Sequence, residues 1–150
     1  MNTAKELYDR WLAQPELDTA VAEELHGIAG DDAAITDRFY RDLEFGTGGL
    51  RGVLGAGTNR MNIYVVRRAT QGLADYLKTF PGGPERGVAI AYDSRHMSDV
   101  FAKETALVLA KNGIKAYLYR TLHSVPQLSF TVLHLNCMAC LLYTSDAADE

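Results

Sequence analysis

The sequence predicts an α/β fold of three layers, in which a largely parallel sheet is covered by helices and preceded by an N-terminal helical extension. Two observations lead to this prediction. In the second half of the chain, short apolar runs typical of strands alternate with longer amphipathic stretches, and this alternation indicates crossover units of parallel strands. In residues 1–45, apolar side chains recur at helical spacing, which indicates added helices.

The composition is that of an ordinary globular protein. The chain has 150 residues, of which 47% are hydrophobic and 23% are charged, enough for one apolar core without metal or disulfide. A net charge of -4 with scattered basic residues disfavours a nucleic-acid partner. The polar start MNTAKELYDR and the short apolar runs match neither a signal peptide nor a membrane span, so we expect a cytoplasmic protein without a membrane partner.

The N-terminal extension, residues 1–45, is expected to hold three helices separated by glycine and proline. Their apolar stripes are Leu7, Trp11 and Leu12, then Val21, Leu25 and Ile28, then Ile35, Phe39, Tyr40 and Leu43. The next segment, FGTGGLRGVLGAGTNRMN, has six glycines between Gly46 and Gly57. This is too many for a regular element, so we expect a shaped loop with at most a short strand.

Strands and helices are expected to alternate through the rest of the chain. A helix over residues 63–80 is capped by Asn62 and ended by PGGPERG. The later elements are expected as a strand over 88–92, a helix from about 98 to 112, a strand over 115–119, a helix around 126–135 and a strand over 139–143.

The two cysteines, Cys137 and Cys140, are spaced as in redox motifs and half zinc sites. A zinc site needs a second pair of ligands, and the spacing of His123 and His134 fits no finger or ribbon. We therefore expect two buried thiols on an apolar strand and no metal ligand in this chain.

Clustered glycines commonly bring backbone N–H groups close to an anion, so phosphate-binding motifs were compared with this loop. The dinucleotide motif fails because Arg51 and Arg60 stand where its third glycine belongs, and the P-loop fails because Thr58 and Asn59 follow Gly57. The remaining candidate is Arg51, whose guanidinium can donate two parallel hydrogen bonds to a phosphate. The alternative is that Arg51 pairs with a carboxylate and braces a tight turn.

The segment FGTGGLRG resembles the N-terminal signature of the α-D-phosphohexomutase family, the phosphoglucomutases and phosphomannomutases, commonly GTSGLRG or GTGGLRG. The resemblance continues through GAGTNRMN, VVRRATQGLADYL, AIAYDSRHMS, FAKETALVLAKNGIKAYLY, SVPQLSF and HLNC. It covers residues 7–139 and implies that residues 46–139 form an incomplete α/β/α domain I of this family.

The resemblance also implies a function. In such enzymes a phosphoserine gives its phosphate to a hexose phosphate, a hexose 1,6-bisphosphate forms and reorients, and Mg2+ supports the transfer. Arg51 matches the catalytic arginine, and the implied phosphate- or substrate-binding residues are Thr47, Gly48, Gly49, Arg95 and His96. For Arg95, pairing with Asp93 to brace the loop is an equal alternative.

The family's catalytic serine lies in TASHNP, directly after the segment that matches HLNCMA. Here the chain reads CLLYTSDAADE, with Thr144 on the first threonine and Asp146 on the serine, or Ser145 there after a one-residue deletion. We therefore expect residues 140–150 to be a non-native tail, similar to a translated sequencing adapter.

We expect this chain to be an inactive N-terminal fragment of a phosphoglucomutase or phosphomannomutase, an isomerase and phosphoprotein of carbohydrate metabolism. Its Mg2+ ligands would lie in parts of the parent enzyme outside this chain. Two alternatives stay open. The chain could be a stand-alone module that binds a phosphorylated ligand through residues 46–52 without catalysis, or a sequence-assembly product that binds nothing.

Overall fold

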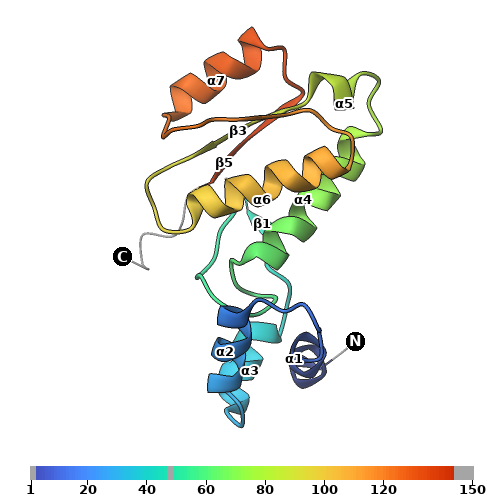
Figure 1. The fold of residues 1–150 in the computed structure, drawn as a ribbon. Helices are drawn as coiled ribbons and strands as arrows, with labels where there is room; N and C mark the ends of the chain where they lie inside the picture. Colours follow the sequence, from blue (N-terminus) through green and yellow to red (C-terminus); the bar gives the residue numbers. More distant parts are fainter. Residues whose placement is uncertain (1–2, 47–48, 144–150) are drawn as a thin grey trace. The chain divides into compact units, whose positions relative to one another are not determined.

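The computed structural model describes residues 3–46 and 49–143, which form two compact units (Figure 1). Unit 1 comprises the described residues up to Val65, and unit 2 begins at Val66. Of the described helices, none is both long and apolar enough to cross a membrane.

Unit 1 contains three helices and a short hairpin. The elements are α1 (Ala4–Leu12), α2 (Thr19–Gly27), α3 (Asp32–Phe39), β1 (Phe45–Gly46) and β2 (Gly49–Leu50), with β1 and β2 antiparallel. Each helix begins at a side-chain cap, provided by Thr3, Asp18 and Asp31. Residues of the predicted apolar stripes pack with Tyr8 and Ala56 in a core that contains Tyr8, Leu25, Ile35, Phe39 and Ala56, whereas Tyr40 of the third stripe is exposed. The core therefore includes a residue of the glycine-rich loop.

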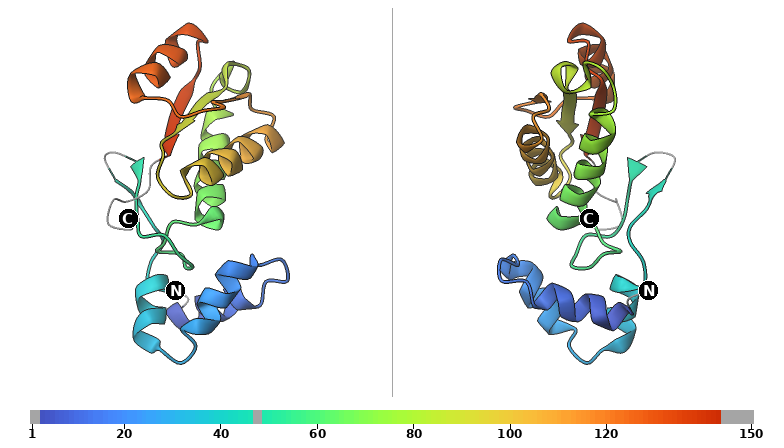
Figure 2. Two further views of the ribbon diagram at one scale, coloured as in Figure 1. Left: turned by 60° about the vertical axis from the view of Figure 1, so that its left-hand side comes forward. Right: turned by 90° about the vertical axis from the view of Figure 1, so that its right-hand side faces the viewer.

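Unit 2 is built on a parallel sheet. Its elements are α4 (Ile63–Leu77, which begins in unit 1), α5 (Gly83–Arg86), β3 (Val88–Tyr92), α6 (Ser98–Lys111), β4 (Ala116–Leu118), α7 (Val125–His134) and β5 (Ala139–Tyr143). The strand order is β4-β3-β5, and both pairings are parallel. Helices lie on both sides of the sheet (Figure 2).

Alternate residues of the central strand β3 face the two helical layers. Val88 and Ile90 pack in a cluster with residues of α4 and α6, whereas Ala89 and Ala91 pack with Leu128 of α7. This two-sided burial explains why β3 is apolar throughout, as parallel strands usually are. The predicted three-layer α/β class is confirmed.

The structure contains the predicted helices and strands, with small differences in their bounds. Asn62 caps α4 as expected, because its Oδ1 accepts hydrogen bonds from the N–H groups of Tyr64 (3.1 Å) and Val65 (3.0 Å). Helix α5 lies inside PGGPERG and is not among the elements predicted from the sequence. Proline reads as a helix breaker, but Pro84 occupies the first turn of α5, where its missing N–H costs nothing.

The prediction of two buried thiols on an apolar strand is only partly right: Cys137 is buried but precedes β5, and Cys140 lies on β5 but is exposed. Cys137 is buried, and burial raises the pKa of its thiol. Cys140 is exposed on β5, which among the described strands pairs only with β3 and lies at an edge of the sheet. Among the described residues no group of three or more His, Cys, Asp or Glu could hold a metal ion.

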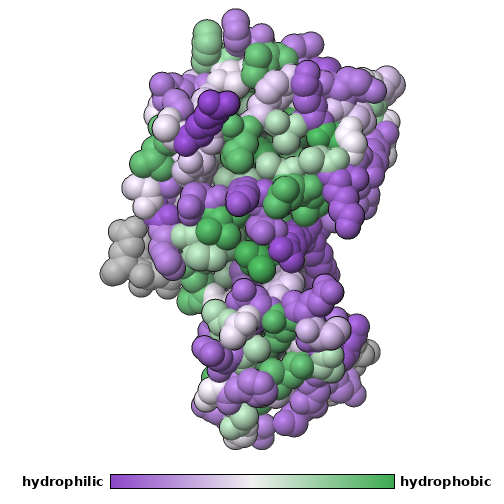
Figure 3. All heavy atoms as spheres, viewed as in Figure 1, coloured by the Kyte–Doolittle hydropathy of each residue, from purple (hydrophilic) through white to green (hydrophobic). Residues whose placement is uncertain are grey.

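Several large apolar side chains of unit 2 are also exposed, including Leu107 on α6 and Phe130 and Leu133 on α7. Figure 3 shows apolar side chains among polar ones on the face of unit 2 that it presents. Scattered apolar side chains are common on protein surfaces and by themselves identify no binding site.

Candidate functional site

The glycine-rich loop of unit 1 folds back on itself after Arg51. The N–H of Met61 donates to the carbonyl of Val53 at 2.8 Å, and the N–H of Gly55 donates to the carbonyl of Met61 at 3.1 Å. The N–H of Leu43 also donates to a carbonyl of this loop, that of Thr58, at 2.8 Å. Arg51 therefore lies between the β1–β2 hairpin and a closed backbone loop.

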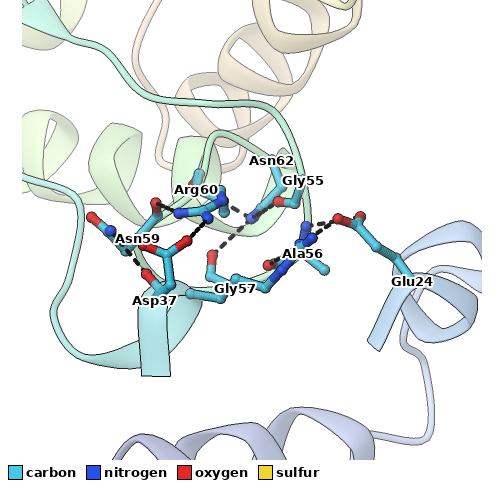
Figure 4. A network of polar contacts seen from close by, with 9 residues as sticks. Glu24, Asp37, Gly55, Ala56, Gly57, Asn59, Arg60 and Asn62 are labelled. Carbon is cyan, nitrogen blue, oxygen red and sulfur yellow. Dashed lines mark hydrogen bonds and ion pairs between the residues drawn. The ribbon is translucent and has the colours of Figure 1, made fainter. Parts of the chain in front are cut away.

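Two charged side chains from the helices hold Ala56 in this loop. Arg38, on α3, forms an ion pair with Glu24, on α2, and its Nη1 donates to the carbonyl of Ala56 at 3.0 Å. The Oε2 of Glu24 accepts from the N–H of Ala56 at 3.0 Å, as Figure 4 shows. Both polar backbone groups of a fully buried residue are thus satisfied.

Further polar contacts fix the rest of the loop (Figure 4). The side-chain amide of Asn62 donates to the carbonyls of Gly55 (2.8 Å) and Gly57 (2.9 Å). Arg60 forms an ion pair with Asp37 of α3. The loop is consequently held by side chains of α2, α3 and the residue that caps α4.

Gly55 and Gly57 are required by the close approach of the helices. Both have positive φ angles, +145° and +132°, which side chains other than glycine rarely adopt. A Cβ at Gly57 would lie 2.6 Å from the carbonyl oxygen of Arg38, and a Cβ at Gly55 would lie 2.7 Å from Oε1 of Glu24. The glycines at these two positions thus allow the helices to contact the loop backbone.

Arg51 is exposed. Within residues 3–46 and 49–143, no carboxylate pairs with Arg51, while Arg38 and Arg60 do pair with carboxylates. The alternative in which Arg51 braces the loop therefore finds no partner in the described part of the chain. Of the other predicted loop residues, Gly49 lies in β2, whereas Thr47 and Gly48 lie outside the described residues.

In unit 2, the loop after β3 is organised by Asp93. Its Oδ1 accepts from the N–H of Arg95 (3.1 Å) and from the hydroxyl of Ser98 (2.9 Å), the buried first residue of α6. Its Oδ2 lies 3.5 Å from Nε of Arg95. Arg95 is thus paired within its own loop, as the bracing alternative requires, and His96 is exposed.

This loop begins beside the end of β5. Tyr92 and Tyr143 are register partners, and the N–H of Asp93 donates to the carbonyl of Tyr143 at 3.2 Å. Open α/β sheets bind ligands at this carboxyl edge of parallel strands. Thr144 and Ser145 come next in the chain and lie outside the described residues.

A row of hydroxyl groups anchors the last residue of β5. The hydroxyl of Tyr143 lies 2.5 Å from that of Thr105, on α6, which lies 3.2 Å from that of Thr70, on α4. Burial raises the pKa of the Tyr143 phenol, and hydrogen bonds to the threonines oppose the rise.

Comparison with known proteins identifies this arrangement. The model of the phosphoglucomutase/phosphomannomutase α/β/α domain I matches residues 42–145. The chain belongs to the phosphoglucomutase/phosphomannomutase family. A "Probable phosphoribomutase" of Schizosaccharomyces pombe is 36% identical over 143 residues, 94% of this chain and 24% of that protein. No solved structure gave a significant match.

Bacterial relatives are similar over a shorter part of the chain. A phosphoglucomutase of Staphylococcus haemolyticus is 40% identical over 107 residues, 71% of this chain and 19% of that protein. A phosphoglucomutase of Staphylococcus saprophyticus is 41% identical over 103 residues, 69% of this chain and 18% of that protein. The chain thus spans at most about a quarter of the length of these family members.

Sequence reasoning missed Glu24 and Arg38, which hold the loop of this phosphoglucomutase/phosphomannomutase domain. The two are separated along the sequence from each other and from Ala56, so no local pattern joins them. The available signal was the pair Gly55 and Gly57, because glycines between apolar residues often mark a close approach of another backbone or side chain.

Proposed function

We propose that this chain is the domain I portion of a sugar-phosphate mutase, an isomerase that interconverts hexose 1-phosphate and hexose 6-phosphate by intramolecular phosphotransfer. The observation that supports this most is the state of Arg51. It is exposed and, within the described residues, unpaired, in a loop that other side chains hold. The loop lies in the segment that matches the mutase domain.

In the proposed reaction, a phosphoserine transfers its phosphate to the hexose phosphate, and a hexose 1,6-bisphosphate forms before the other phosphate returns to the serine. Such transfers are accelerated by positioning and by neutralising charge on the transferring oxygens. Arg51 would donate its paired N–H groups to these oxygens. Thr47, Gly48 and Gly49 would add donors from the same loop, and Arg95 and His96 would bind the substrate.

We propose that this chain alone does not isomerise hexose phosphates. It spans at most about a quarter of its relatives' length. The Mg2+ of the complete enzyme, a cytoplasmic phosphoprotein in this proposal, would be held by residues outside this chain. No step assigned to Arg51 depends on the metal.

A pentose phosphate is the second candidate substrate, because the Schizosaccharomyces relative is described as a probable phosphoribomutase. A non-catalytic module that binds a phosphorylated ligand is the second candidate function. Calorimetry with glucose 1,6-bisphosphate separates that module from an enzyme domain. Weak binding fits either one, whereas a dissociation constant tighter than about 1 μM would favour the dedicated binder.

The proposed function is tested with a chimera. In it, this chain replaces the matching segment of the Staphylococcus haemolyticus phosphoglucomutase, and the Staphylococcus protein supplies the catalytic serine and all residues that follow the serine. Arg51→Ala should lower turnover about a hundredfold to a thousandfold, because a preorganised charged donor is lost. Arg51→Lys should recover only part of the activity, since lysine lacks the forked geometry.

The melting temperature of the same preparations provides the control. An exposed arginine without a described partner contributes little to stability, so Arg51→Ala should melt close to the unsubstituted chimera. A lowered melting temperature with nearly normal turnover would contradict the proposal and favour a bracing role for Arg51.

A further inference from the structure

We propose that Glu24 and Arg38 are positioning residues for the phosphate loop. Acting through Ala56, they hold the backbone that presents Arg51. This inference rests on the proposed function of Arg51, but the contacts that carry it lie entirely within unit 1. It assigns a role in phosphate binding to the N-terminal helices α2 and α3, which precede the segment matched by the domain model.

The contacts form a continuous path from the helices toward Arg51. Glu24 and Arg38 bind the N–H and the carbonyl of Ala56. The adjacent N–H of Gly55 donates to Met61, and the N–H of Met61 donates to Val53. Val53 is two residues from Arg51, so the path of hydrogen bonds ends close in sequence to the guanidinium-bearing residue.

The ion pair restrains the loop in a way that apolar packing alone does not. The methyl group of Ala56 lies in the core of unit 1. This packing holds the side chain of Ala56 in the core but does not fix the orientation of the peptide groups on either side of Ala56. Hydrogen bonds to both the N–H and the carbonyl fix their orientation. The side chains of Arg38 and Glu24 are 20% and 36% exposed, and loss of one partner would leave the other partly buried and unpaired.

The experiment compares Glu24→Ala and Glu24→Gln with a matched control, Glu104→Ala. Glu104 forms an ion pair with Arg67 in unit 2, and its side chain is 18% exposed against 36% for Glu24, so the control removes an ion-paired carboxylate that is more covered and far from this contact path in sequence. Two quantities are measured on the 150-residue chain: amide hydrogen exchange by NMR, and the dissociation constant for glucose 1,6-bisphosphate by calorimetry.

Glu24→Ala should lower the exchange protection of Gly55, Ala56 and Met61 about tenfold or more, because the charged acceptor that closes the loop is gone. Its dissociation constant should rise about tenfold, since the binding-competent loop becomes a minor state. For Glu24→Gln, the exchange protection and the dissociation constant should both lie between those of the unsubstituted chain and those of Glu24→Ala, because the amide oxygen of glutamine can still accept a hydrogen bond from the N–H of Ala56. Glu104→Ala should change neither the exchange protection of these loop amides nor the dissociation constant for glucose 1,6-bisphosphate.

A folded Glu24→Ala variant that binds glucose 1,6-bisphosphate within twofold of the unsubstituted chain would overturn the inference. If the unsubstituted chain does not bind the bisphosphate, the proposed function fails, and exchange alone then decides the inference. Unchanged protection at Gly55 and Met61 would overturn it, and tenfold lower protection would support it. If Glu24→Ala does not fold, Glu24→Gln and Arg38→Lys are judged by the same criteria.

Discussion

The two loops that were predicted to bind phosphate use their arginines differently. In unit 1, Arg51 is exposed and has no carboxylate partner within the described residues, while Arg38 and Arg60 tie the loop to the helices. In unit 2, Arg95 itself pairs with Asp93 of its own loop. A motif match places an arginine in the sequence, but the neighbouring side chains decide whether its guanidinium is available.

This difference has a physical basis. A guanidinium that pairs with a carboxylate must give up that partner, or share it, before it binds a phosphate, which reduces the net gain from binding. A guanidinium left free by a loop that other residues hold is already available. We therefore expect changes at the bracing residues of the unit 1 loop to lower both stability and phosphate binding, and changes at Arg51 to lower phosphate binding alone.

The largest loss of stability is expected for Gly57→Ala. The new Cβ would lie 2.6 Å from the carbonyl oxygen of Arg38, at a φ of +132°, so unit 1 should lose about 2–4 kcal/mol of unfolding free energy. The single tryptophan, Trp11, belongs to unit 1, and its fluorescence during urea unfolding measures this loss.

Gly72→Ala is the matched control, because a Cβ at Gly72 in α4 would meet no atom within 4 Å. It should be neutral or stabilise the chain by up to about 1 kcal/mol through helix propensity. Equal stability of Gly57→Ala and Gly72→Ala would contradict the inference that α3 approaches the loop too closely to leave room for a Cβ at position 57.

A smaller loss is expected for Asn62→Ala, which removes the cap of α4 and the donor shared by the carbonyls of Gly55 and Gly57. The cost should be about 1–3 kcal/mol by the same fluorescence measurement. Asn59→Ala is the control, since the side-chain contacts of Asn59 are exposed, and it should cost less. Equal costs would show that the buried contacts of Asn62 do not hold the loop.

The next effect contrasts the two loops directly. Asp93→Ala should cost about 1–2 kcal/mol, because Ser98 and Arg95 both lose an acceptor. Arg51→Ala should stay within about 0.5 kcal/mol of the unsubstituted chain. Thermal unfolding followed by circular dichroism gives both values. A larger loss of stability for Arg51→Ala than for Asp93→Ala would contradict the contrast between the two loops.

The last effect depends on pH and concerns Tyr143, at the end of β5 beside the Asp93 loop. Burial raises its pKa above the ordinary value of 10.0, so the folded chain holds the phenol proton more tightly than the unfolded chain. This contribution is fully present below pH 10 and is lost as the pH rises from there through the folded pKa.

Tyr143→Phe should therefore weaken the fall in unfolding free energy at alkaline pH and leave neutral stability within about 1 kcal/mol. Denaturant titrations at a series of pH values from neutral to alkaline measure this difference. An identical pH dependence in the two proteins would contradict burial of the phenol.

Much of the fold follows from local sequence patterns. The strand β3 was predicted because a run of buried aliphatic residues bounded by Gly87 and Asp93 suits a strand covered on both faces. The helix α4 was predicted from its apolar period and the cap at Asn62. Helix α5 was not, because four residues beginning Gly-Pro carry no periodic signal.

The candidate site could be predicted only in part. Arg51 was predicted as an anion ligand because its glycine-rich surroundings are contiguous in sequence, and this role stays a prediction. The pair of Glu24 and Arg38 was not, because contacts between α2, α3 and Ala56 depend on the packing of three separate segments. The exposure of Cys140 was missed for a related reason, since an apolar run does not reveal that its strand lies at the edge of the sheet.

The most direct test of the central claim is a titration of the chain with glucose 1,6-bisphosphate, followed by the NMR signals of the arginine Nε–H groups. We predict a saturable shift of the Arg51 signal, a smaller shift for Arg38, and loss of binding in Arg51→Ala at unchanged melting temperature. Binding of the bisphosphate with the same affinity by Arg51→Ala would contradict phosphate recognition by this loop.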